Sequence, residues 1–161
     1  MAVINVTSGS QAVLTLGNTS TLAEPDNASG FAIPLVQDVS VSTQPGTVRY
    51  STLDSTSSSA FTTVMENEIS FNMLLDDDAF FGNAGVTDNS VATNGLWSTS
   101  NSKTEINFSI AFEGDVNGSG GYYLEGSGFI GGLAPSASID QAVWISPGTI
   151  IVNGDLTKQT L

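Results

Sequence analysis

The feature that most constrains the fold is a run of strict alternation at residues 104–113. Apolar side chains recur there at every second position, at Ile106, Phe108, Ile110 and Phe112. The positions between them are Glu105, Asn107, Ser109, Ala111 and Glu113. Successive side chains point to opposite faces in a β-strand, whereas a helix repeats every 3.6 residues. The run therefore predicts a half-buried strand with one apolar and one polar face.

Shorter patterns of the same kind predict further strands separated by turn-forming residues. Residues 68–73 alternate strictly, with Glu68, Ser70 and Asn72 on the polar face. Further strands are expected at residues 12–16, 35–43, 122–131, 141–145 and 149–153. A break at Ser146-Pro147-Gly148 is expected to separate the last two strands.

One short helix is expected to begin at Asp76-Asp77-Asp78, because carboxylates cap the free N–H groups of a first turn. Residues 82–103 are polar and turn-rich, with Trp97 as an isolated anchor. The predicted fold class is therefore all-β, a β-sandwich or barrel with one flanking helix and long loops.

The domain organisation is predicted to be simple, since 161 residues suit one domain. Residues 1–30 are rich in turn formers and are expected to be a weakly anchored arm with one short strand. Residues 31–161 are expected to form a single β-sandwich domain with an extended loop at about 43–63. That loop contains the low-complexity run Ser-Thr-Ser-Ser-Ser at residues 55–59.

Composition excludes several classes of function. The chain has 16 acidic residues, three basic residues and no His or Cys, and its formal net charge is −13. Catalytic triads, thiol nucleophiles and zinc or haem sites therefore lack their usual ligands and bases. Three basic residues also give no electropositive surface for gripping nucleic acid or an anionic membrane. We expect no enzyme activity, no cofactor and no membrane anchor.

Three local features could carry binding chemistry, but each has a simpler interpretation. Residues 115–120, Asp-Val-Asn-Gly-Ser-Gly, fit half of a calcium-loop pattern, but position twelve is Gly126 and a β-turn explains the run better. Residues 76–78 could contact a cation or a partner, although helix capping accounts for them. Aromatic residues could form a sugar-stacking platform or, more commonly, core and interface anchors. These residues are Trp97, Trp144, Tyr122 and Tyr123.

The polar faces of the two alternating strands are acidic and carry no basic residue. Glu105 and Glu113 bracket the polar face of one strand, and Glu68 begins that of the other. Such a surface repels anions, and the repulsion is stronger in an enclosed space whose walls lie within a few Debye lengths, each about 8 Å. An outward face in contact with solvent is the plain alternative.

The order of several short motifs resembles the major tail proteins, or tail-tube proteins, of phages with long flexible tails. The motifs are Val-Arg-Tyr-Ser-Thr-Leu-Asp at 48–54, Glu-Asn-Glu-Ile-Ser-Phe-Asn-Met-Leu-Leu-Asp at 66–76, Tyr-Leu-Glu-Gly-Ser-Gly-Phe-Ile at 123–130 and Leu-Ala-Pro-Ser-Ala at 133–137. The resemblance covers about residues 36–155. Asn67 departs from the Gly that often precedes the Glu in the family, and the segment before the strand at Thr104 is long.

The resemblance implies a β-sandwich flanked by a helix that self-assembles into hexameric rings, which stack into a hollow tube. The implied partners are further copies of the chain, a tape-measure protein, tail-end proteins and double-stranded DNA in transit. The implied location is the virion tail, assembled in the host cytoplasm. Two alternatives remain: another β-rich virion protein, such as a capsid-decorating or fibre protein, and a carbohydrate-binding module.

The resemblance also assigns roles to particular residues. The lumen of the tube is expected to be lined by Glu68, Ser70, Asn72, Glu105, Asn107 and Glu113. Stacking between rings is expected to use residues 43–63, in particular Pro45, Arg49, Tyr50, Leu53, Asp54 and Phe61.

Overall fold

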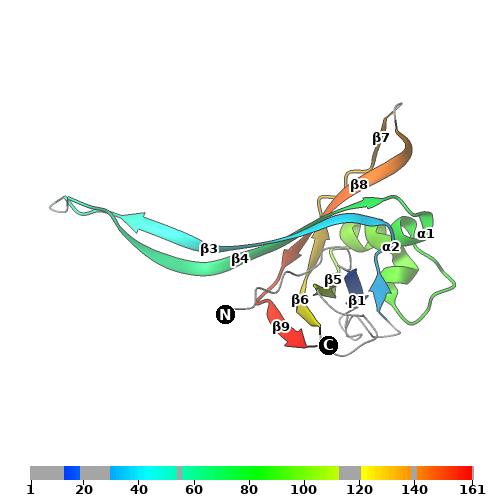
Figure 1. The fold of residues 1–161 in the computed structure, drawn as a ribbon, viewed down its shortest axis with the longest axis horizontal. Helices are drawn as coiled ribbons and strands as arrows, with labels where there is room; N and C mark the ends of the chain where they lie inside the picture. The colour runs from blue at the N-terminus through cyan, green and yellow to red at the C-terminus, as the bar shows by residue number, and fades with distance from the viewer. Residues whose placement is uncertain (1–12, 19–29, 54–55, 113–120, 139–140, 161) are drawn as a thin grey trace, which may run out of the picture.

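The computed structural model describes residues 13–18, 30–53, 56–112, 121–138 and 141–160 (Figure 1). The strands are β1 (Val13–Asn18), β2 (Phe31–Ala32), β3 (Val36–Tyr50), β4 (Ser59–Leu74), β5 (Glu105–Ala111), β6 (Tyr122–Gly131), β7 (Ser136–Ser138), β8 (Gln141–Val152) and β9 (Thr157–Thr160). The helices of this described part are α1 (Asp77–Phe81) and α2 (Ser90–Asn101).

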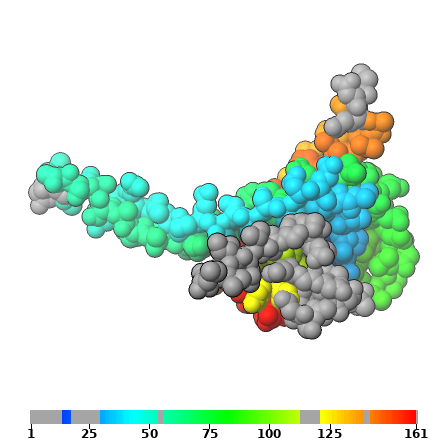
Figure 2. Space-filling view, viewed as in Figure 1, coloured from blue at the N-terminus to red at the C-terminus, as the bar shows by residue number. Residues whose placement is uncertain are grey.

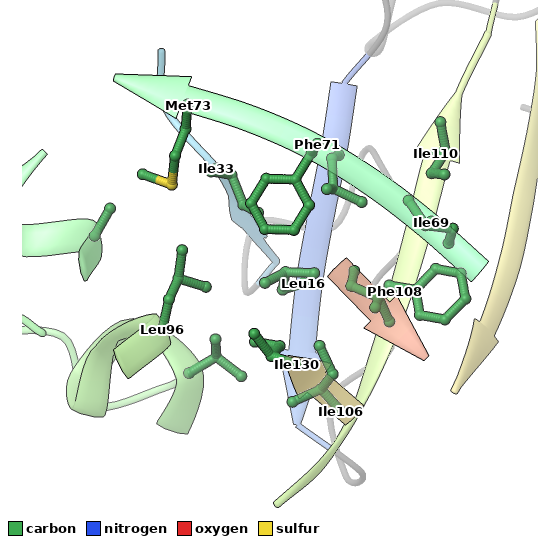
Figure 3. Packing of buried hydrophobic residues seen from close by; sticks show 14 residues of the cluster. Leu16, Ile33, Ile69, Phe71, Met73, Leu96, Ile106, Phe108, Ile110 and Ile130 are labelled. Atoms are coloured by element: carbon green, nitrogen blue, oxygen red, sulfur yellow. The ribbon is translucent and has the colours of Figure 1, made fainter. Parts of the chain in front are cut away.

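The strands form one antiparallel, nine-stranded sheet in the order β2-β1-β5-β6-β8-β4-β3, with β7 beside β8 and β9 beside β6. The sheet folds back on itself, so that β4 crosses over β1 and β5 with the core between them (Figure 3). The predicted all-β fold is confirmed, and its layers belong to a single folded sheet.

The core is built from the alternating apolar faces of the central strands. Ile69, Phe71 and Met73 of β4 face Ile106, Phe108 and Ile110 of β5, and all six side chains are buried (Figure 3). Leu96 of α2 packs against the same cluster. Burying a side chain of this size contributes about 1.5–3 kcal/mol, so the faces predicted from alternation also hold the fold together.

Two core aromatic rings lie over cross-strand glycines. Phe71 is directly opposite Gly148, and a Cβ atom at Gly148 would be 2.3 Å from Cζ of the ring. Phe108 is directly opposite Gly126, where a Cβ atom would be 2.9 Å from Cζ. Because these glycines have no side chain, the rings fit in the space above them. A shift in strand register would place a larger residue under each ring, so the glycines help to fix the register.

The helices pack through an unusually close backbone contact. Asp76 caps α1 by accepting a hydrogen bond from the Ala79 N–H at 3.0 Å. Gly82 ends α1 with φ 100°, and Gly95 kinks α2 with φ 78° and ψ 164°. A Cβ atom on Gly95 would lie 2.4 Å from the Gly82 nitrogen. Both glycines are therefore required by backbone conformation and by space.

We expect Gly95→Ala to lower the free energy of unfolding by about 2–4 kcal/mol, because backbone strain and overpacking add. Gly154→Ala is the matched control, since Gly154 has φ 102° and no atom lies within 4 Å of the place that its Cβ atom would occupy. The control should lose only about 1–2 kcal/mol, the cost of strain alone. Urea denaturation measures the free energy of unfolding of both variants, provided that the m-value is unchanged. Equal losses of stability in the two variants would show that the contact between Gly82 and Gly95 is unimportant.

Several predicted elements differ from the observed ones. Segment 82–103, predicted to be turn-rich, contains α2. The predicted break at residues 146–148 is wrong, because β8 continues through it. The prediction of a weakly anchored start does not hold for Val13–Asn18, since β1 pairs with β2 and β5 and buries Leu14 and Leu16. Strands β2, β7 and β9 were not predicted. The extended loop predicted at about residues 43–63 is largely a β-hairpin, because β3 and β4 remain paired as far as Tyr50 and Ser59. The partial calcium-loop run at 115–120 lies outside the described residues.

Candidate functional site

The face of the sheet opposite the core carries a largely polar surface, here called the outer sheet face. Directly paired residues project to the same side of an antiparallel sheet. The register aligns one such row across five strands: Glu105, Phe129, Ile151, Glu68 and Ser42. The neighbouring rows are Gly131, Thr149, Ser70 and Ser40, and then Pro147, Asn72 and Asp38.

The carboxylates of this face are held by amides and hydroxyls. Glu105 Oε1 accepts hydrogen bonds from Asn153 Nδ2 at 2.8 Å and from Ser127 Oγ at 3.0 Å. Asn72 Nδ2 donates to both carboxylate oxygens of Asp38 at 3.0 Å. Neutral donors orient a carboxylate without cancelling its charge. The face is therefore ordered and negative.

The predicted lumen residues divide into three groups. Glu68 and Asn72 are exposed, and Ser70 is half-buried beside Glu68. Glu105 and Asn107 are half-buried on the same face, as the register requires. Glu113 lies outside the described residues. The open part of the polar side of β5 does not extend to Ser109 and Ala111, which are buried at 0% and 2% exposure.

Sequence reasoning missed the members of the outer sheet face that are not polar. Phe129 and Ile151 are adjacent, and their exposed fractions are 36% and 58%. They lie between Glu105 and Glu68 in the same row. Periodicity in β6 and β8 does not reveal this, because only the register between strands places the pair between two carboxylates.

A second feature is the long hairpin formed by β3 and β4, which projects from the body of the molecule (Figures 1 and 2). We call residues 43–65 of this hairpin the arm. Within the described part of the arm, only Gly46 is half-buried and the other residues are exposed. Its exposed apolar residues are Val48, Tyr50, Leu53, Phe61, Val64 and Met65.

The arm contains the predicted stacking residues. Pro45 and Arg49 lie on β3 with Tyr50, Leu53 lies in the turn, and Phe61 lies on β4. Tyr50 and Phe61 pack with ring centroids 6.1 Å apart. Asp54 lies outside the described residues. A clustered aromatic pair on a projecting hairpin is typical of a contact that another molecule completes.

A hollow of about 530 Å³ lies where the arm leaves the body. Its lining includes Glu66 and Glu68 of β4 and Ile151 of β8. Asn67 in the same lining is 9% exposed, and its Oδ1 atom has no hydrogen-bond partner. The arm base therefore joins the outer sheet face, and its surface is acidic.

A second pocket, which we call the acidic pocket, lies beside α1 and the start of α2. Its volume is about 310 Å³, and its lining contains three carboxylates and no basic residue. The lining residues are Gly30, Phe31, Asp76, Asp78, Ala79, Asn83, Val86, Asp88, Asn89 and Ala92. Asp78 Oδ2 accepts a hydrogen bond from Asn83 Nδ2 at 3.0 Å.

The other candidate binding features do not converge in space. Trp97 on α2 packs beside Phe80, with ring centroids 5.8 Å apart. Trp144 on β8 is exposed, and Tyr122 on β6 lies under the Lys158 ammonium at 3.9 Å, while Tyr123 is buried. Among the described residues, no group of three His, Cys, Asp or Glu is arranged to hold a metal. In the same part of the chain, no helix is long and apolar enough to span a membrane.

No known family profile matches the sequence, and no curated protein matches it. Solved structures do match. The tail of an empty gene transfer agent (GTA) particle, computed with C6 symmetry, superposes with a TM-score of 0.64 at 13% identity, covering 96% of this chain and 100% of that chain. The SPP1 tail tube superposes with a TM-score of 0.66 at 12% identity, covering 97% of this chain and 80% of that chain.

A third match is to the sheath-tube complex of an extracellular contractile injection system, with a TM-score of 0.60, 14% identity, and coverage of 97% of this chain and 93% of that chain. At these identities the similarity establishes the fold. The chain therefore has the tail-tube fold, and the resemblance seen in its motifs is confirmed at that level.

Proposed function

We propose that the protein assembles into hexameric rings that stack into a phage-type tail tube, and that its outer sheet face lines the channel. The observation that carries the proposal is the row in which Glu105 and Glu68 lie on one face of a single sheet. Sequence motifs could place these carboxylates only on separate strands. A shared face lets identical copies present a continuous negative wall.

The chemistry of that wall suits the passage of DNA. Each phosphate that a protein neutralises adds sequence-independent affinity, so a conduit should offer phosphate no cation. Among the described residues of the outer rows there is no Lys or Arg, and Glu68 and Asp38 add negative charge. The Asn and Ser side chains keep the surface hydrated. The lumen residues proposed on this basis are Glu68, Ser70, Asn72, Glu105 and Asn107, with Glu113 added from the sequence pattern.

The open edges of the sheet support assembly within a ring. Strand β3 pairs only with β4, so one side of a 15-residue strand is unpaired among the described residues. Long open edges are normally covered, and a ring of copies covers them. The arm, with Arg49, Tyr50 and Phe61, would bridge successive rings.

The proposed role is structural, in the virion tail, following assembly in the host cytoplasm. The expected partners are other copies of the chain, a tape-measure protein during assembly, tail-end proteins and double-stranded DNA in transit. The similar solved structures include a tube-terminating cap and a baseplate of the anti-feeding prophage. The cap is described as terminating a tube, which supports tail-end partners here.

Electron microscopy of the purified protein in negative stain tests the proposal. We expect rings or tubes with a central channel, and six-fold symmetry in end-on class averages. Sedimentation velocity at rising concentration should show the same assemblies. A protein that stays monomeric at high concentration and across salt conditions would contradict the tube and favour a decoration protein or a binding module.

A further inference from the structure

The arm and the acidic pocket lie at opposite ends of the molecule. In Figure 1 the hairpin of β3 and β4 runs away from the body on the side far from α1 and α2. The strand segment from Thr43 to Tyr50 alone spans roughly 23 Å at 3.3 Å per residue. The tip of the arm therefore cannot reach the pocket of its own chain.

Charge limits which surfaces of two copies can attract each other. Each copy carries 16 acidic and three basic residues, so two copies repel at most orientations. The basic residues are Arg49, Lys103 and Lys158. Lys158 already lies over the Tyr122 ring, whereas Arg49 is exposed near the end of the arm. Lys103 is also exposed, but it lies just after α2 on the body of the molecule, so Arg49 is the basic residue that the arm can carry to another copy.

The acidic pocket has the complementary chemistry. Asp76, Asp78 and Asp88 supply carboxylates, and Phe31 and Val86 supply apolar walls. A guanidinium binds carboxylates through two parallel N–H···O bonds, and its methylene stem packs on apolar surface. A pocket of about 310 Å³ is at the small end of ligand pockets, which suits one long side chain.

We propose that Arg49 of one copy inserts into the acidic pocket of a second copy, between α1 and the start of α2. This contact rests on the proposed tube and identifies the surface that receives the arm. Because donor and acceptor lie at opposite ends, the contact is head-to-tail, and a head-to-tail contact between copies in successive rings can repeat along a tube.

Asp88 is the carboxylate to change, because the other two serve the fold. Asp76 caps α1 and Asp78 holds Asn83, whereas Asp88 shows no hydrogen bond to the rest of the described chain. We expect Arg49→Glu and Asp88→Arg, each alone, to lower the fraction of protein pelleted as tubes by at least about tenfold at low salt. The double variant should recover at least about a third of the wild-type yield, since the swapped pair attracts again.

Lys103→Glu and Asp155→Arg are the matched controls. They change net charge by the same amounts at exposed positions that belong to neither the arm nor the lining of the acidic pocket. Both should form tubes in wild-type yield. Single variants that assemble like the wild type, or a double variant without recovery, would overturn the contact while leaving the tube itself intact. Absence of wild-type tubes would instead contradict the proposed function.

A cross-linking experiment tests proximity without relying on charge. The chain has no cysteine, so an engineered pair reports one contact. Ser51→Cys on the arm and Ala84→Cys beside the pocket replace residues at accessible positions. Under copper-phenanthroline, the double variant should give a ladder of disulfide-linked multimers, and a mixture of the two single variants should give linked dimers. A second double variant, Ser51→Cys with Ser138→Cys, places the partner cysteine away from the pocket. A ladder from this variant and none from the Ser51→Cys, Ala84→Cys variant would contradict the docking site.

Discussion

Removing the arm should abolish tubes and leave a folded protein. Gln44 and Glu66 are directly opposite each other in the hairpin. Replacing residues 45–65 with Asn-Gly would close the strands by a two-residue type I′ turn. The described residues of this segment are exposed apart from the half-buried Gly46, so the free energy of unfolding should change by less than about 1 kcal/mol. Tubes should be absent by electron microscopy, while the thermal unfolding midpoint should stay near that of the wild type.

A milder pair of variants separates the chemistry of the arm from its length. Tyr50→Ser with Phe61→Ser removes the exposed aromatic pair while keeping the hairpin. Thr47→Ser with Thr62→Ser, on directly paired positions, is the matched control. The first should weaken stacking and shorten tubes, and the second should not. Normal tubes from the arm deletion would show that stacking uses another surface.

The alternating strands could be predicted because a half-buried strand needs apolar and polar residues at alternate positions. In β5 the apolar residues Ile106, Phe108 and Ile110 are all buried, as alternation requires. In β4, Ile69, Phe71 and Met73 follow the same rule. Asp76 was predicted to cap a helix and does so. The helix cap depends on a contact between residues close in sequence, and the burial of the strand residues depends only on which face of the strand meets the core.

The missed elements depend on contacts that are distant in sequence. The Ser-Pro-Gly run of β8 has the composition of a turn, yet Gly148 is needed because the Phe71 ring occupies its side-chain space. Helix α2 is short of helix-forming residues and contains Gly95, whose conformation is fixed by contact with Gly82. Tertiary packing here overrides propensity, and one sequence does not reveal it.

In the candidate site, too, local patterns could be predicted and contacts distant in sequence could not. The polar faces carrying Glu68 and Glu105 were visible as patterns, but their common face follows only from the register through Phe129 and Ile151. The burial of Ser109 was also invisible, since a small polar residue fits either side of a strand. Residue types could be predicted, whereas their neighbours across the sheet could not.

Reversing one charge on the outer sheet face should make assembled tubes bind DNA. Glu68→Lys changes each copy by two charges at an exposed position that makes no core contact, so folding and tube formation should be preserved. Repeated around every ring, the new ammonium groups would neutralise phosphates and release counterions. Wild-type tubes should not retain a short DNA duplex in co-sedimentation at about 50 mM salt, whereas the variant should. Between about 50 and 200 mM salt its affinity should fall by about 10³-fold or more if it contacts six or more phosphates.

The location of the bound DNA decides whether the outer sheet face lines the channel. Asp155→Lys makes the same charge change at an exposed position outside the rows of that face, and serves as the control. Duplex held inside Glu68→Lys tubes should resist a nuclease too bulky to enter the channel, and any duplex on Asp155→Lys tubes should be digested at the rate of free DNA. Rapid digestion on both variants would place Glu68 on the outside of the tube. Protection on the Glu68 variant alone would place the carboxylates of Glu68 and Glu105 together on the wall past which DNA moves, because one row of the sheet joins them.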